Sequence, residues 1–175
     1  ANAVVLGFLP GMEGGVAMAD ILFGDVNPSG KLPISYPRNT NDIVHYDHKP
    51  METFDPNQYN PLYPFGYGLS YSQFETSGLR LDKTQINIGD NIEVSVDVKN
   101  SGKITGKEAV LVYLNDVVAS VTRPTKQLKA FAKVELKPNE SQTLHFDLSS
   151  DAMSFIGVDM KRRIEAGEFK VMVGS

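Results

Sequence analysis

The sequence predicts a mainly β protein, in which a β-sandwich follows a partial α/β segment (one strand and one helix) and a long irregular strap. From Phe74 onward, apolar and polar residues alternate in short runs with turn signals every ~8–12 residues, as in two-sheet sandwiches. Before residue 37, an apolar run is followed by apolar residues at helical spacing. We therefore expect three parts: residues 1–37, the strap of residues 38–73, and the sandwich of residues 74–175.

The first part is expected to be the C-terminal remnant of an α/β-sandwich domain. Ala3 to Leu9 form an apolar run that is typical of a short buried strand and ends at Pro10. From Val16 to Phe23, apolar residues recur at helical spacing, and Gly24 follows as a stop signal. Because a single strand and helix cannot bury their own apolar faces, we expect a preceding part of the polypeptide to complete the layer.

The strap has no regular periodicity. Just before it, Ile34 to Tyr36 lie between two prolines, which permits an edge strand but forbids a central one. Structureless connections as long as residues 38–63 tend to be functional or to wrap another domain. From Tyr63 to Tyr71, aromatic residues alternate with glycine and proline, a density that indicates burial against a neighbour. We expect an ordered strap between two domains.

The third part is expected to form roughly seven strands in a fibronectin type III-like (immunoglobulin-like) sandwich without the paired cysteines of antibody domains. Ile92 to Val98 give the clearest alternation, and Ala109 to Leu114 are apolar on both sides, as expected for a central strand. Within Leu128 to Leu136, we expect Phe131, Val134 and Leu136 to point inward. Further strands are expected around residues 79–81, 142–148 and 169–173.

Composition narrows the function classes. The net charge of −4 argues against nucleic acid or an anionic membrane as a partner, and the longest basic run is Lys161 to Arg163. The absence of cysteine excludes disulfides, thiolate nucleophiles and zinc–thiolate sites. No apolar stretch reaches the ~18 residues that a membrane span needs. We expect no cofactor.

The sequence gives little support for a catalytic role of any residue in this chain. Glu13 is the one carboxylate in the loop between the expected strand and helix, but the helix dipole would keep it ionised, which suits a helix start better than a general acid. The glycines around it lack the spacing of a phosphate-binding loop. Ser29 is not part of a nucleophile elbow. We therefore predict no catalytic residue in this chain.

Other polar residues favour structural roles. His45, Asp47 and His48 form an HYDH cluster that could ligate a metal, but the irregular spacing favours hydrogen-bonded structural histidines, and we predict no metal site. His145 is expected to be exposed on a strand. Turn or cap roles are expected for Asp42, Glu52 and Asp55.

The aromatic residues of the strap have two interpretations. Packing between domains is favoured, and stacking on sugar rings at an outer subsite is the alternative. The residues concerned are Tyr59, Tyr63, Phe65, Tyr67 and Tyr71.

Several motifs resemble one enzyme family in collinear order. PGMEGG at residues 10–15 and ADILFGDVNPSGKLP at residues 19–33 resemble the end of the second, α/β-sandwich domain of glycoside hydrolase family 3. YPFGYGLSY at residues 63–71 resembles the segment that leads into that family's C-terminal domain. Matches to its fibronectin type III-like domain lie at residues 98–102, 106–108, 123–124, 128–131 and 166–169.

The resemblance implies the C-terminal portion of a retaining, exo-acting β-glycosidase of the β-glucosidase or β-xylosidase type, active on terminal β-linked sugars. In this family the nucleophilic aspartate lies on a preceding barrel-like domain, and the acid/base glutamate would lie upstream of Ala1. Neither motif has a counterpart here, and Glu13 does not match the acid/base motif. The resemblance therefore implies a structural fragment that is inactive alone, with the upstream domains as its partners.

Two other hypotheses stay open. The sandwich could be a carbohydrate-binding or adhesion module, which a row of exposed aromatic residues on one face would favour. Alternatively, its loops could join a homodimer and reach the neighbour's active-site rim. A periplasmic or secreted bacterial location is expected.

Overall fold

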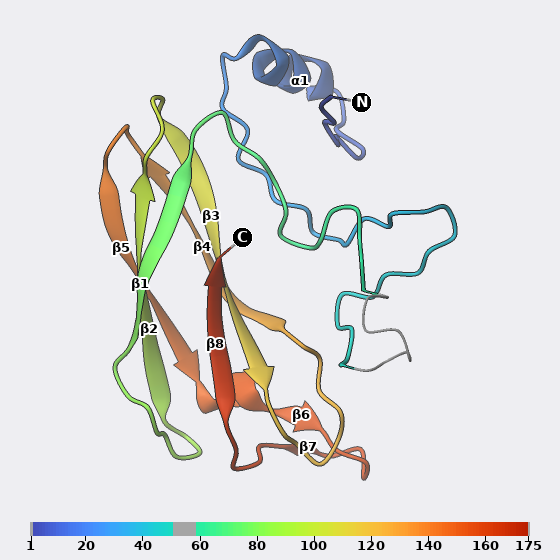
Figure 1. The fold of residues 1–175 in the computed structure, drawn as a ribbon, viewed down its shortest axis with the longest axis vertical. Coiled ribbons are helices and arrows are strands. Elements are labelled where there is room, and N and C mark those ends of the chain that lie inside the picture. The colour runs from blue at the N-terminus through green and yellow to red at the C-terminus, as the bar shows by residue number, and fades with distance from the viewer. Residues whose placement is uncertain (1, 51–58, 175) are drawn as a thin grey trace.

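In the computed structural model, which describes residues 2–50 and 59–174, most of the regular structure lies in one β-sandwich (Figure 1). Helix α1 (Gly14–Phe23) precedes it, and a long irregular segment connects the two. The predicted mainly β fold is confirmed. Within the described residues, no helix is long and apolar enough to cross a membrane.

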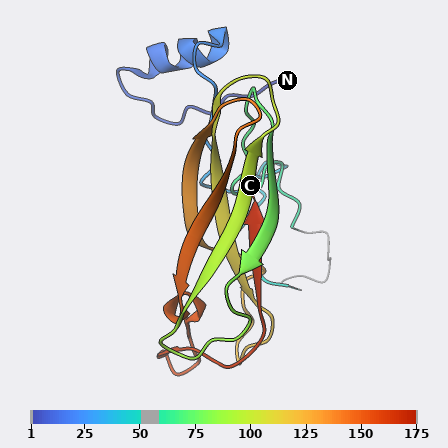
Figure 2. The same ribbon diagram turned by 90° about the vertical axis from the view of Figure 1, so that its left-hand side faces the viewer.

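The sandwich consists of two three-stranded antiparallel sheets. The first has the order β1–β2–β5, and its strands are β1 (Phe74–Leu81), β2 (Asn91–Asn100) and β5 (Ser141–Ser149). The second has the order β4–β3–β8, and its strands are β3 (Gly106–Asp116), β4 (Gln127–Leu136) and β8 (Phe169–Gly174). Figure 2 shows the sandwich from the side of the β1–β2–β5 sheet, with the strap behind it.

The core lies between the sheets and follows the two-residue period of the strands. On β2, the even-numbered residues from Ile92 to Val98 are buried, while Glu93 is exposed. The same alternation buries residues of β3, β4 and β5: Val110, Val112, Leu114, Val134, Leu136, Leu144, Phe146 and Leu148. Burying each such side chain stabilises the fold by roughly 1.5–3 kcal/mol before the entropy cost.

A short hairpin at one end of the sandwich was not predicted. It pairs β6 (Phe155–Ile156) with β7 (Arg162–Arg163), after a short 3-10 helix (Ser150–Met153). Phe155 is buried, and the guanidinium carbon of Arg123 lies 4.6 Å from the centre of its ring. Two-residue strands are too short to show alternation, so the sequence pattern missed them.

The predicted strand from Ala3 to Leu9 is wrong, because these residues form no strand and Leu9 is almost fully exposed. A strand needs a partner for its backbone groups, and no described segment pairs with this one. The helix prediction is confirmed. Gly24 ends α1 in the left-handed conformation, with φ 87°, and its N–H donates to the carbonyl oxygen of Ile21.

The predicted edge strand at residues 34–36 is reduced to one isolated bridge between Tyr36 and Tyr63. The N–H of Tyr36 donates to the Tyr63 carbonyl oxygen over 2.7 Å, and the N–H of Leu32 donates to that of Tyr67 over 2.8 Å. The flanking prolines have no N–H to donate, so the pairing does not extend into a ladder. The strap is thus held against the chain that precedes it.

The predicted inward position of Phe131 is also wrong. Val134 and Leu136 are buried as expected, but Phe131 is 71% exposed and lies opposite Leu111 on the outer face of the sheet. The inward positions nearest to it on β4 are taken by Ala130 and Ala132, which pack against the core. Because 131 is odd and 134 and 136 are even, the three residues cannot share one face of a regular strand.

Truncating Leu136 should therefore destabilise the chain far more than truncating Phe131. Leu136 is 1% exposed, so Leu136→Ala should lower the free energy of unfolding by about 2–5 kcal/mol. Phe131→Ala should change it by about 0.5 kcal/mol or less. Urea denaturation followed by circular dichroism measures both. Equal losses would mean that Phe131 packs in the core.

Candidate functional site

The chain's most elaborate polar site joins residues 27–31 to the sandwich. The Lys31 ammonium lies 2.9 Å from Glu108 Oε1, and both side chains are about nine-tenths buried. Lys31 Nζ also donates to the carbonyl oxygen of Gly68 over 2.9 Å. Glu108 continues the inward row of β3 beyond Val110, so the ion pair closes one end of the core. A buried ion pair is stable only when its two charges lie close together and their remaining polar atoms are hydrogen-bonded.

Asn27 connects the strap to the same end of the sandwich. Its side-chain oxygen accepts hydrogen bonds from the Tyr71 N–H, over 2.8 Å, and the Ser70 hydroxyl, over 2.9 Å. Its amide nitrogen donates to the Thr105 carbonyl oxygen over 3.3 Å. The Tyr71 hydroxyl donates to the carbonyl oxygen of Ile21 on α1 over 2.7 Å. One asparagine therefore bridges the end of the strap and the loop before β3.

Asn100 is the most buried residue of the junction, the name we give to the contact of residues 27–31 and 70–72 with the sandwich. It has no exposed surface, and its amide nitrogen donates to the carbonyl oxygens of Ile104, over 2.8 Å, and Leu136, over 2.9 Å. Its oxygen accepts from the Ser72 hydroxyl over 2.7 Å and from the Gly102 N–H over 3.0 Å. All four hydrogen-bonding positions of the side chain are filled, as burial of an amide requires.

Farther along, the strap covers the outer face of β3 over Tyr113. The ring centre of Phe65 lies 6.5 Å from that of Tyr113, and Lys126 Nζ lies 4.7 Å from the same ring. Tyr46 packs edge-on against Phe65, and its hydroxyl accepts a hydrogen bond from the Leu128 N–H over 2.6 Å. Burial raises the pKa of Tyr113 to about 12, with smaller contributions from Tyr46 and another strap tyrosine.

His48 is a structural residue of the strap. Its ring stacks on Tyr59 with 3.4 Å between the centres, and Nε2 lies 2.8 Å from the Thr125 hydroxyl. His45 and Asp47 are exposed. The described part of the chain contains no group of three or more His, Asp or Glu residues that could hold a metal. The stacking of His48 on Tyr59 and its contact with Thr125 favour the structural interpretation of this residue.

Among the remaining predicted residues, Asp42 and His145 have local partners. Asp42 accepts a hydrogen bond from the Asn39 N–H over 2.9 Å, as a turn residue does. His145 is exposed and lies 3.1 Å from Glu93. Glu13 is the N-cap residue of α1 but makes no side-chain cap hydrogen bond. The predictions for Glu52 and Asp55 lie outside the described residues.

The aromatic residues of the strap contact each other and other segments. Tyr63 and Tyr67 stack with 5.0 Å between ring centres, and the Tyr59 hydroxyl lies 3.1 Å from the Ser35 hydroxyl. Because a stacked ring has one face already occupied, these contacts favour packing over sugar stacking. In the sandwich, residues 74–174, Phe131 is the one exposed aromatic side chain, so no aromatic row supports a carbohydrate-binding face.

The sequence reasoning missed the junction residues Asn27, Lys31, Asn100 and Glu108. A signal was present for two of them. Asn100 has the inward parity of Val98, and Glu108 has that of Val110. A polar residue at an inward position requires a buried partner, although the pattern does not name it.

These contacts define a fibronectin type III-like module that is joined through the strap to the segment that contains helix α1. In the comparison with family models, a fibronectin type III-like domain matches residues 108–175, and the glycosyl hydrolase family 3 C-terminal domain matches residues 1–71. The chain belongs to glycosyl hydrolase family 3 and corresponds to the C-terminal part of its members.

Named relatives and solved structures agree. A periplasmic β-glucosidase of Salmonella typhimurium is 44% identical over 99% of this chain and 25% of its own length. A β-xylosidase of Formosa agariphila is 42% identical over 94% of this chain and 24% of its own length. A β-glucosidase structure from Listeria innocua, in complex with glucose, superposes with a TM-score of 0.87 at 41% identity and covers 95% of this chain and 25% of that one. The chain thus spans about a quarter of the length of these relatives.

Removing one partner of the buried ion pair should be costly. Lys31→Met leaves the Glu108 carboxylate buried without its cation, so the free energy of unfolding should fall by about 3–5 kcal/mol. The double variant Lys31→Met/Glu108→Leu removes both charges and should recover much of the loss. Urea denaturation of both variants measures this. If Lys31→Met is as stable as the unchanged chain, the ion pair does not secure the junction.

The phenol of Tyr113 should titrate at unusually high pH. Its raised pKa means that the folded chain keeps this proton while the unfolded chain loses it near pH 10, so its contribution to stability is complete below pH 10 and is lost between pH 10 and about 12. Phenolate absorbance during a pH titration should show one late phenol, which Tyr113→Phe removes. A late phenol that persists in the variant would contradict the assignment.

Proposed function

We propose that this chain is the C-terminal portion of a retaining, exo-acting β-glycosidase of the β-glucosidase type. The observation that carries the proposal is the collinear match along 99% of the chain to a relative named as a β-glucosidase. A relative named as a β-xylosidase matches at nearly the same identity. We therefore propose terminal β-linked glucosides or xylosides as the substrate class of the complete polypeptide.

Within that enzyme, the role of this chain is structural. The buried ion pair of Lys31 with Glu108 and the hydrogen bonds of Asn27 fix the sandwich to the α/β element. Glu13, the carboxylate considered for catalysis, is an exposed helix-start residue without a side-chain cap contact. These positions support a brace, while the nucleophile and the acid/base residue belong to the preceding domains.

The name of one relative supports a proposal for the location of the complete polypeptide. The Salmonella relative is named as periplasmic, which supports export of the complete polypeptide. Substrate for such an enzyme would be oligosaccharides released outside the cytoplasm. A homodimer stays a prediction, and light scattering of the complete polypeptide measures it.

The test compares the complete polypeptide with this chain on 4-nitrophenyl β-glucoside, β-xyloside and α-glucoside. We expect the complete polypeptide to hydrolyse at least one β-glycoside with retention, seen by NMR as β-anomeric product before mutarotation, and to leave the α-glucoside intact. This chain alone should hydrolyse none. Turnover by the chain alone would overturn its structural role, and no β-glycosidase activity in the complete polypeptide would overturn the enzyme assignment.

A further inference from the structure

Phe131 is an exposed aromatic residue next to a buried face. It is 71% exposed on β4, whereas its cross-strand neighbour Leu111 on β3 is 7% exposed. Tyr113, on the same outer face of β3, is covered by Phe65 of the strap and by Lys126. The strap therefore covers the outer face of this sheet at β3 but leaves Phe131 on β4 exposed.

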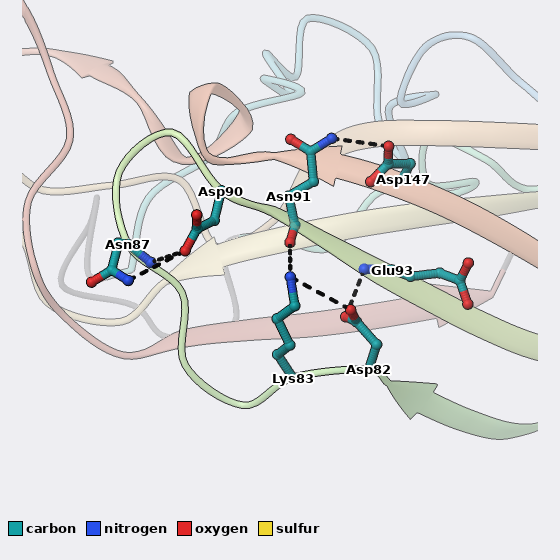
Figure 3. Close-up of polar contacts among 7 residues, drawn as sticks. All are labelled: Asp82, Lys83, Asn87, Asp90, Asn91, Glu93 and Asp147. Atoms are coloured by element: carbon teal, nitrogen blue, oxygen red, sulfur yellow. Dashed lines mark hydrogen bonds and ion pairs between the residues drawn. The ribbon is translucent and has the colours of Figure 1, made fainter.

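The two outer faces of the sandwich differ in character. Figure 1 places α1 and the strap on the side of β3 and β8, away from β1, β2 and β5. On the β1–β2–β5 side, polar groups satisfy each other at the sheet surface and the adjoining loop (Figure 3). Asn91 donates to Asp147 over 3.0 Å, and Asp82 accepts from the Glu93 N–H over 2.8 Å. Polar contacts of this kind cover part of this face, whereas Phe131 on the other sheet exposes most of an aromatic ring.

We propose that Phe131 is the anchor through which the sandwich docks onto the part of the polypeptide that precedes this chain. This inference rests on the proposed function, because the relatives extend over about four times the length that the chain matches. Val16, Leu22 and Phe23 of α1 also expose apolar surface, and a neighbouring part of an α/β layer would cover it. One body can then cover α1 and Phe131 together.

The neighbours of Phe131 predict which kinds of side chain form the surface onto which it docks. An exposed phenylalanine that anchors an interface fills an apolar pocket. Lys133, the next outward residue on β4, is exposed and makes no ion pair within residues 2–50 and 59–174. We therefore expect an apolar pocket with at least one carboxylate at its rim, near Lys133.

Hydroxyl-radical footprinting tests the proposal with an internal control. Ile88, in the loop between β1 and β2, is 74% exposed, close to the value for Phe131. In the complete polypeptide, oxidation of Phe131 should fall about tenfold relative to this chain alone, as a side chain in an interface core does, while oxidation of Ile88 stays the same. Unchanged oxidation of Phe131 would overturn the proposal, as would equal protection of both residues.

Variants at the same two positions give a second measurement. Backbone hydrogen exchange along β4 should be slower in the complete polypeptide than in this chain, and Phe131→Ser should reverse most of that protection, by about tenfold. Ile88→Ser should leave it unchanged. If this chain alone protects Phe131 in a concentration-dependent way, the occupant is a second copy and the proposal is wrong. Neither measurement depends on glycoside hydrolysis. A negative result for the Phe131 proposal can therefore be told apart from a negative glycosidase assay.

Discussion

Strand β3 carries the contacts of three parts of the chain, because each of its faces is buried by a different neighbour. Its inward residues Val110 and Val112 form the core with the other sheet. Its outward residue Tyr113 lies under the strap, and Glu108 at one end binds Lys31. A strand that is apolar on both faces is stable only when both are covered, so the position of the strap follows from the sequence of β3.

The strap depends on the sandwich for its position more than the sandwich depends on the strap. The sandwich core is formed by residues of the two sheets, and residues 1–37 approach it chiefly through Lys31. The strap, in contrast, has little regular structure of its own and is held by side chains such as Tyr46, whose hydroxyl is bonded to β4. Within the described residues, the core of the sandwich therefore contains no residue of the strap, whereas the strap is positioned by contacts such as that of Tyr46 with β4. The hydrogen bond from Ser72 to Asn100 and the ion pair of Lys31 with Glu108 favour one docking position, because another would leave the Glu108 carboxylate without its cation.

Strand alternation predicted the part of the fold that depends on local pattern. It located the strands around Val96, Leu111 and Phe146, because a buried face forces a two-residue period on the sequence. It failed at Phe131, where the apolar side chain belongs to the outer face, and from Ala3 to Leu9, where an apolar run has no strand partner among the described residues. The junction pairs residues distant in sequence, such as Lys31 with Glu108, and no local pattern encodes such a pairing.

The two failures have a common physical cause. An apolar residue in the sequence predicts that its side chain is buried, but it does not predict which residues cover it. For Val134 the covering residues lie in the opposite sheet, and the pattern and the structure agree. For Leu9 and Phe131 the described chain holds no cover, so the same apolar signal appears as exposed surface. The chain spans about a quarter of the length of its relatives, and this exposed apolar surface is where we propose contact with the rest of the polypeptide. On β2 and β5 of the opposite sheet, charged residues such as Glu93 and Asp147 alternate with the core, and the exposed apolar residues of that sheet, Leu79 and Leu81 on β1, are 43% and 38% exposed, less than Phe131.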